Sequence, residues 1–193
     1  MLLSAVDFSH SLLKETVCKG DLVIDATVGN GSDTVLLATL VGPTGKVIGF
    51  DVQKQAVENT AQKLLLAGLT DQVTLLHQGH ETLADVLADN AKIGGAIFNL
   101  GYLPGSDKTI ITKKNTTIRA IEALLPKLRI GSYILLVVYS GHPGGMEEKN
   151  ALIDYCSSLN QSLFKVLQYG FINQINHPPF LIAIEKKKTP YTK

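Results

Sequence analysis

Two acidic residues and the glycine turn between them form the most informative pattern in the chain. The apolar run Leu22–Ile24 ends in Asp25, and Gly29 and Gly31 follow it. Glycines let a ligand approach the backbone because they carry no Cβ. A second carboxylate, Asp51, follows Gly31 by 20 residues, a spacing typical of a carboxylate that binds a ribose hydroxyl. A strand, a glycine turn and a helix N-terminus together predict a site for a nucleotide-like ligand.

The residues of this turn indicate which nucleotide it would bind. A dinucleotide site has a third glycine at the start of the helix, whereas this chain reads G-N-G-S-D-T from Gly29 and places Asp33 where a diphosphate would lie. A carboxylate there disfavours phosphate and suits a cation. S-adenosylmethionine has a ribose, a sulfonium and an ammonium, and it has no phosphate. A nicotinamide-dependent oxidoreductase is therefore the least favoured function, and a turn without a ligand is the structural alternative.

A second group of polar residues could hold a methyl acceptor. The segment Asn99-Leu100-Gly101-Tyr102 has the Asn-x-x-Tyr form seen in methyltransferases that act on amino groups. The Asn99 oxygen could direct the attacking nitrogen, and Tyr102 could stack on a base or lie near the developing ammonium. An alkylamine must be neutral to attack, and His142 or Asp33 could take its proton. Turn and packing roles for Asn99, Tyr102 and His142 are the alternatives.

The elements that would position these residues alternate between strand and helix. The last two strands are joined by a loop too short for a crossover helix, so they should pair antiparallel. Alternation predicts a mostly parallel α/β sheet covered on both faces. Seven strands with the last one reversed give the Rossmann-like class I methyltransferase architecture, as one domain over residues 1–193. The apolar pattern predicts helices at about 1–20, 32–41, 53–66, 81–89, 112–128 and 146–159, and strands at 22–25, 46–51, 73–77, 95–100, 132–139, 164–171 and 180–185.

Ligands of open α/β sheets bind beyond the carboxyl ends of the strands, so the polar residues that follow each strand should meet there. His10 could be a site residue on its helix, but we expect it to be a surface or internally hydrogen-bonded histidine. We expect His77 to be a core histidine. The cofactor candidates at this edge are Asp25, Thr27, Gly29, Asn30, Gly31, Asp33, Asp51, Gln53, Gly79, His80 and Glu81. The acceptor candidates are Asn99, Tyr102, Asp107, Tyr139 and His142.

Composition narrows the cellular context. The net charge of +1 gives no overall attraction to nucleic acid, so an RNA substrate would need a local basic patch. The run Lys186–Lys188 is the densest candidate, although such runs are more often solvated tails. Cys18 and Cys156 have neither pairing nor metal-ligand spacing, so no metal site is predicted. No apolar run reaches the length of a membrane span and no secretory signal pattern is present, so we expect a cytoplasmic protein without a membrane partner.

Three separated motifs resemble the YtqB-like family, labelled “putative rRNA methylase”: Asp25–Thr34, Asn99–Lys108 and Tyr139–Gly145. Members of this family are similar to MnmM-type tRNA methyltransferases. The resemblance implies methylation of the aminomethyl nitrogen of 5-aminomethyl-(2-thio)uridine at the wobble position, with the tRNA anticodon arm as partner. It implies that Asn30, Asp33, Asp51, Gln53, His80 and Glu81 line the cofactor, and that Asn99, Tyr102, Tyr139 and His142 face the acceptor.

Other functions stay open beside this one. A methyltransferase acting on rRNA or on a small-molecule amine is the first alternative, and a cofactor-binding module without catalysis is the second. An anticodon arm is larger than the expected mouth of the site, so a homodimer surface could help to hold it.

Overall fold

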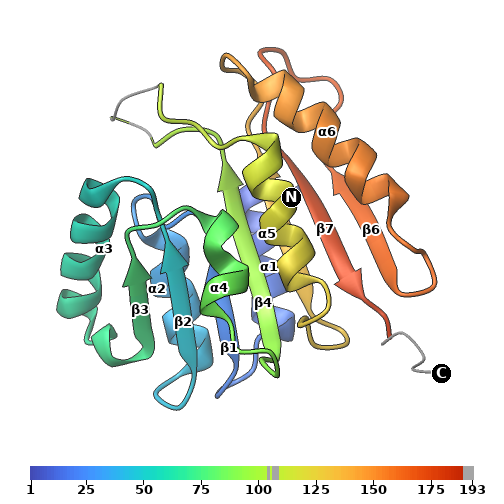
Figure 1. Ribbon diagram of the computed structural model, residues 1–193. Coiled ribbons are helices and arrows are strands. Elements are labelled where there is room, and N and C mark those ends of the chain that lie inside the picture. The colour runs from blue at the N-terminus through green and yellow to red at the C-terminus, as the bar shows by residue number, and fades with distance from the viewer. Residues whose placement is uncertain (104, 106–108, 189–193) are drawn as a thin grey trace.

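The computed structural model describes residues 1–103, 105 and 109–188, and a seven-stranded sheet runs through its centre (Figure 1). The strand order is β3-β2-β1-β4-β5-β7-β6. β7 pairs antiparallel with both of its neighbours, and the other paired strands are parallel. The predicted fold class is therefore confirmed. The strands are β1 Leu22–Asp25, β2 Lys46–Phe50, β3 Val73–Leu76, β4 Ile93–Leu100, β5 Tyr133–Val138, β6 Phe164–Tyr169 and β7 Phe180–Lys186.

The central strands are apolar because helices cover both faces of the sheet. In β4 all residues but Asn99 are buried, and β5 is buried after its first residue. Strand β6 lies at the edge, so its middle residues are exposed. Asn99 interrupts the apolar pattern near the carboxyl end of β4, the edge at which ligands of such sheets bind.

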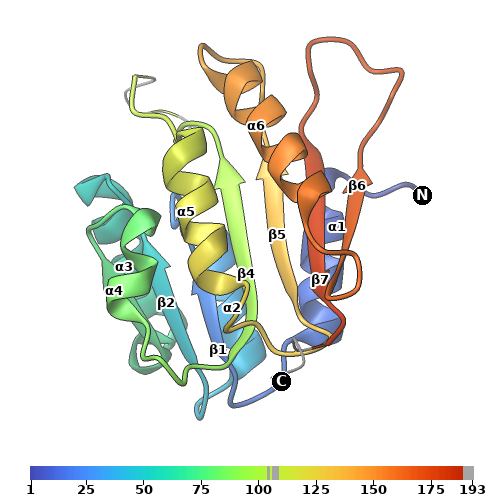
Figure 2. The ribbon, with the colours of Figure 1, turned by 45° about the vertical axis from the view of Figure 1, so that its right-hand side comes forward.

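One helix before β1, and five helices with two short 3₁₀ turns in the described connections between strands, form two layers (Figure 2). Helices α1, α2 and α3 pack residues such as Leu13, Leu37 and Leu64 against one face. Helices α4, α5 and α6 pack Leu83, Ile121 and others against the opposite face. The helices are α1 Ala5–Thr16, α2 Ser32–Val41, α3 Lys54–Ala67, α4 Leu83–Val86, α5 Lys114–Leu124 and α6 Gly145–Ser158, with 3₁₀ turns η1 Thr70–Gln72 and η2 His80–Thr82.

Some predicted boundaries were wrong for local reasons. The helix expected over 1–20 starts after Ser4, whose hydroxyl oxygen accepts the N–H of Asp7 as an N-cap. The helix expected over 81–89 is instead the short turn η2 followed by the four residues of α4. Strand β3 ends at Leu76, so His77 lies beyond it, exposed, with Nε2 3.0 Å from the Val52 carbonyl oxygen. His77 is therefore not a core histidine.

The basic run at residues 186–188 lies at the wrong edge of the sheet to serve the predicted site. Because β7 is antiparallel, its last residue, Lys186, lies at the edge where the parallel strands begin. Its side chain is buried, and Nζ donates to the carbonyl oxygens of Leu125 and Pro126 just after α5. Lys186 therefore caps a helix end, as cations do favourably. Within the described part of the chain, no helix has both the length and the apolar character needed to cross a membrane.

Candidate functional site

A cavity of about 800 Å³ opens beyond the carboxyl ends of β1 to β5. Helix α1 and the segment before α5 complete its walls. The predicted residues that line it are Thr27, Gly29, Asn30, Asp33, Asp51, Gln53, Gly79, His80, Glu81, Asn99, Tyr102 and Tyr139. Asp25, Gly31 and His142 lie outside its lining, and Asp107 falls outside the described residues.

Asp25 lies beneath the cavity rather than in its wall. The carboxylate is fully buried and accepts hydrogen bonds from the Thr34 hydroxyl at 2.6 Å and the Thr27 N–H at 3.2 Å. It thereby ties the end of β1 to the first turn of α2. Burial, reinforced by the negative charge of Asp33, raises the pKa of Asp25 to about 7. The predicted contact of Asp25 with the cofactor is thus replaced in the structure by a role in holding the turn.

The two glycines of the turn serve different purposes. Gly31 has φ +78°, and a Cβ there would lie 2.5 Å from Oγ1 of Thr60 on α3, so close packing between helices demands glycine at this position. Gly29 has φ +50°, and its N–H points to Asp51. Gly29 lines the cavity and leaves room for a ligand to approach the backbone, whereas Gly31 does not line it.

Asp51 joins the loops that follow β1 and β2. Its Oδ2 accepts the N–H of Gly29 and its Oδ1 accepts the N–H of Gln53, both at 2.8 Å. A carboxylate has about four acceptor sites, so each oxygen can accept one more hydrogen bond from a ligand. The arrangement presents a fixed carboxylate edge and the Gln53 side chain to the same part of the cavity. This is the chemistry that two vicinal ribose hydroxyls require.

His80 forms part of the cavity floor as a neutral imidazole. Its Nδ1 lies 3.0 Å from the Ala26 carbonyl oxygen, and because a carbonyl only accepts, Nδ1 carries the proton. Burial lowers the pKa of His80. Behind it, the buried Glu148 of α6 accepts hydrogen bonds from the hydroxyls of Thr117 at 2.8 Å and Thr112 at 2.7 Å. This network fastens α5 and the cavity-lining Thr112 to α6.

The acceptor side of the cavity is organised around Asn99. Its backbone N–H donates to the Thr27 hydroxyl at 2.7 Å, which joins the ends of β4 and β1. Its side-chain Nδ2 donates to Oδ2 of Asp33, and Oδ1 of Asp33 lies 2.6 Å from Nε2 of His10. The side chains of Asn99 on β4, Asp33 on α2 and His10 on α1 therefore form one hydrogen-bonded chain along the cavity wall.

Tyr102 and Tyr139 lie at the cavity wall, and His142 packs behind Tyr102. The rings of Tyr102 and His142 are perpendicular, with centroids 5.8 Å apart. Nδ1 of His142 lies 3.0 Å from the Pro143 carbonyl oxygen, while Nε2 is buried without a hydrogen-bond partner among the described residues. Burial, followed by the charge of Asp33, raises the pKa of the Tyr139 hydroxyl. His142 thus supports the acceptor side without lining it.

Two parts of the wall are not among the site residues predicted from sequence, although His10 was considered as one. His10 lines the cavity together with Val6, and their four-residue spacing on α1 was the available signal, since such residues share a helix side. The segment 109–113 also lines it. This segment folds back because the Thr112 N–H donates to the Gly101 carbonyl oxygen at 3.0 Å and Ile111 pairs with Tyr102. No periodic pattern marks such a loop.

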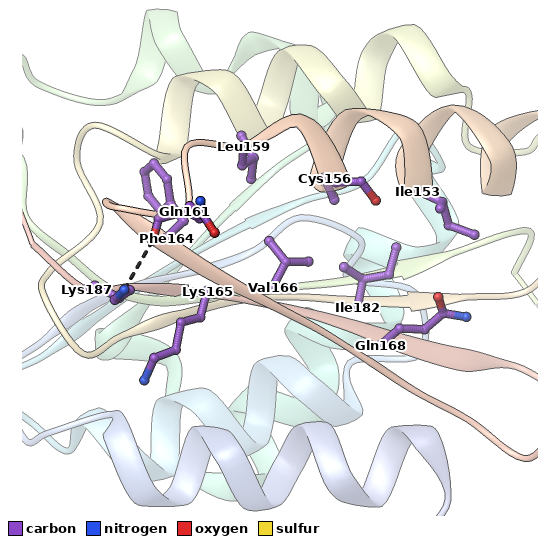
Figure 3. Close-up of a pocket in the computed structure, with 11 residues that line it drawn as sticks. Ile153, Cys156, Leu159, Gln161, Phe164, Lys165, Val166, Gln168, Ile182 and Lys187 are labelled. Carbon is purple, nitrogen blue, oxygen red and sulfur yellow. Dashed lines mark hydrogen bonds between the residues drawn. The ribbon is translucent and has the colours of Figure 1, made fainter.

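A second hollow, of about 540 Å³, lies between α6, β6 and β7 (Figure 3). In Figure 3, Val166 and Ile182 point toward Cys156 on α6, whereas Lys165 points away from that helix. Its described lining contains two lysines, Lys165 and Lys187, and no carboxylate. A cationic ligand is disfavoured beside such charges.

The larger cavity fits S-adenosylmethionine better. Its volume falls in the range of small-molecule sites. Asp33 and Asp51 line it, and their carboxylates favour a cation and disfavour a phosphate. Apolar Phe50 and Val52 lie beside Asp51, where a base attached to the bound ribose could pack.

Comparisons with known proteins agree with this site. The family described as “Putative rRNA methylase” matches residues 47–185. The chain is 36% identical over 191 residues to “tRNA (mnm(5)s(2)U34)-methyltransferase, chloroplastic” of Arabidopsis thaliana, a match that covers 95% of this chain and 70% of that protein.

Two solved structures resemble the chain over nearly its whole length. The “putative rRNA-methylase” from Clostridium thermocellum has a TM-score of 0.93 at 41% identity, covering 96% of this chain and 99% of the other. SMU.1697c, a “putative methyltransferase” from Streptococcus mutans “in complex with SAH”, has a TM-score of 0.88 with the same identity and coverage. The predicted enzyme class and cofactor are thereby confirmed as S-adenosylmethionine-dependent methyl transfer, and the chain belongs to the family described as “Putative rRNA methylase”.

Proposed function

We propose that this chain methylates the aminomethyl nitrogen of 5-aminomethyl-(2-thio)uridine at the wobble position of tRNA, giving 5-methylaminomethyl-(2-thio)uridine. The observation that carries the proposal is the orientation of Asn99. Because a carboxylate only accepts hydrogen bonds, Asp33 draws the Nδ2 end of the amide and leaves Oδ1 for a ligand. An acceptor at that point suits a nucleophile that carries N–H groups, which is what an amine offers. The name of the Arabidopsis relative supports tRNA as the carrier of that amine.

The cofactor would be held by residues of the first two loops. Asp51 binds the ribose hydroxyls, Gln53 extends that contact, and Asn30 with Asp33 faces the methionine part. The Asn30 carbonyl oxygen accepts a hydrogen bond from Nζ of Lys63 on α3 at 2.5 Å, which helps to order this loop. When bound, S-adenosylmethionine supplies a methyl group whose bond to sulfur breaks with its electron pair passing to sulfur, while the amine nitrogen gains the methyl and releases one proton.

The acceptor would be held by residues of the fourth and fifth loops. Oδ1 of Asn99 accepts one amine N–H, which aims the nitrogen lone pair into the cavity. Tyr102 and Tyr139 pack against the uracil ring, as aromatic side chains do with unstacked bases. Burial beside a bound cation lowers the pKa of the amine and favours its neutral form. Of the two predicted proton acceptors, Asp33 lines the cavity and His142 lies behind Tyr102, so Asp33 is the better placed.

The test is nucleoside mass spectrometry of tRNA from a strain that lacks this protein. We expect 5-methylaminomethyl-(2-thio)uridine to disappear and the 5-aminomethyl form to accumulate. Reintroduced wild type should restore the methylated nucleoside, and Asn99→Ala should not. An unchanged nucleoside profile in the deletion strain would overturn the proposal. Label from S-adenosylmethionine that appears in rRNA or in a small amine, and not in tRNA from that strain, would replace it with one of the alternative acceptors.

A further inference from the structure

His10 on α1 lies at the cavity wall, whereas the sequence favoured a surface or internally hydrogen-bonded histidine. Its Nε2 is 2.6 Å from Oδ1 of Asp33, and the exposed fractions of the two side chains are 23% and 9%. The contact is therefore largely shielded from water, which strengthens a charge-assisted hydrogen bond. Because the carboxylate can only accept, Nε2 of His10 is the donor.

Asp33 depends on its two neighbours for its orientation. Among the described side chains, His10 and Asn99 hydrogen-bond to Asp33, one at each carboxylate oxygen. With both bonds in place the carboxylate plane is fixed. Without His10 one oxygen loses its donor, and the terminal torsion of an aspartate side chain is broad.

The orientation of Asp33 decides which end of the Asn99 amide faces the cavity. An amide has a donor end and an acceptor end of nearly equal size. Asp33 holds the donor end, so the acceptor end is left for the substrate. If the Asp33 carboxylate rotated away, the Asn99 amide could turn over. Its nitrogen would then face the amine of the substrate, and two hydrogen-bond donors would oppose each other.

We propose that His10 is a positioning residue that acts through Asp33 to keep Oδ1 of Asn99 directed at the methyl acceptor. Catalytic groups in other enzymes are oriented in a similar way: one residue contacts the substrate, a second holds the first, and a third fixes the second. The identity of the acceptor as a tRNA amine rests on the proposed function, whereas the orientation of the amide does not.

The kinetic test compares three substitutions of His10. In His10→Gln the side-chain Nε2 can still donate to Asp33, whereas His10→Asn places its amide too near the backbone and His10→Ala has no donor. We expect His10→Ala and His10→Asn to lower kcat roughly 10- to 100-fold, and His10→Gln to remain within about threefold of wild type. His10→Gln, which keeps the hydrogen bond to Asp33, should also bind S-adenosylmethionine with wild-type affinity when measured by calorimetry. Lys14→Ala, an exposed substitution on the same helix, is the control.

Two kinetic outcomes would overturn the proposal. If His10→Gln is as impaired as His10→Ala, the imidazole itself takes a proton and donor positioning is not its role. If His10→Ala keeps full activity, the hydrogen bonds that link His10 to Asn99 through Asp33 have no effect on catalysis.

A spectroscopic readout separates this inference from the proposed function. The side-chain amide protons of Asn99, assigned by their loss in Asn99→Ser, should be well dispersed in the ¹H–¹⁵N spectrum of the wild type. His10→Ala should move them toward the positions of a freely rotating amide, and His10→Gln should retain them. Unmoved signals in His10→Ala would refute the inference for any substrate. Displaced signals together with unchanged tRNA in the deletion strain would reject the proposed substrate and keep the positioning role.

Discussion

The buried carboxylate of Asp25 should make the stability of this protein fall as the pH rises from 5 to 8. Its pKa is raised from 3.8 to about 7, first by burial and then by the charge of Asp33. Between these values the unfolded chain has lost the proton and the native state has kept it. The native state therefore binds more protons, and increasing pH favours unfolding. From the two pKa values, the loss in unfolding free energy between pH 5 and 8 is roughly 3 kcal/mol.

Asp25→Asn should remove this dependence. The amide has no proton to lose in this range. Its oxygen can still accept the N–H of Thr27, and its Nδ2 can donate to the Thr34 hydroxyl oxygen in place of the bond that Oδ2 accepts. Urea unfolding at pH 5, 6, 7 and 8 and constant ionic strength measures the difference. The unfolding free energy of Asp25→Asn should rise relative to that of the wild type as pH rises. Asp89→Asn, which changes an exposed carboxylate, should follow the wild-type curve. Parallel curves for wild type and Asp25→Asn would show that Asp25 is already ionised at pH 5 in the native state and would refute this prediction.

Three further substitutions test the site and its supports. Asp51→Asn should weaken calorimetric binding of S-adenosylmethionine by about tenfold or more, because a carboxylate bond to a hydroxyl is worth roughly 1.5–3 kcal/mol; unchanged affinity would contradict the ribose role. Gly31→Ala should lower the urea unfolding free energy by roughly 1–3 kcal/mol, since φ is +78° and the new Cβ would meet Thr60; an unchanged urea midpoint would contradict this. Glu148→Gln should raise the KM for the tRNA of the proposed function and leave cofactor affinity unchanged, because Thr112 loses a charged acceptor. Steady-state kinetics and calorimetry measure the two effects, and weakened cofactor binding with an unchanged KM would contradict the prediction.

The sheet could be predicted from sequence because each strand is a short apolar run bounded by turn residues. The reversed last strand could be predicted from the length of the connecting loop, since Ile172 to Pro179 is too short to cross the sheet. Helix α4 was overestimated because residues 81–89 contain helix-forming types, yet the chain leaves the helix after Val86 and Leu87 is already extended. Local composition does not record where tertiary packing ends a helix.

The candidate site could be predicted in part. Asp51 and Asn99, which line the cavity, could be identified because each lies at the carboxyl end of an apolar strand, the edge where such sheets bind ligands. Asp25 and Gly31 follow the same rule, but the structure uses them to hold the turn. His10 was not assigned to the site because the four-residue spacing with Val6 shows only that the two share a helix side, and not that α1 crosses β4, β5 and β7 and brings His10 to Asp33. Contacts between segments far apart in sequence carry this information.

The place of β7 in the sheet bears on how the protein is made. It lies between β5 and β6, so β6 finds its partner only after residues 180–186 have left the ribosome. Until then the nascent chain exposes the bare edge of β5, an apolar strand, and an unpaired β6. Unpaired strand edges of this kind are where growing chains aggregate or recruit chaperones. Truncated products that stop in the loop before Phe180 should therefore be degraded by proteases rather than accumulate in the cell.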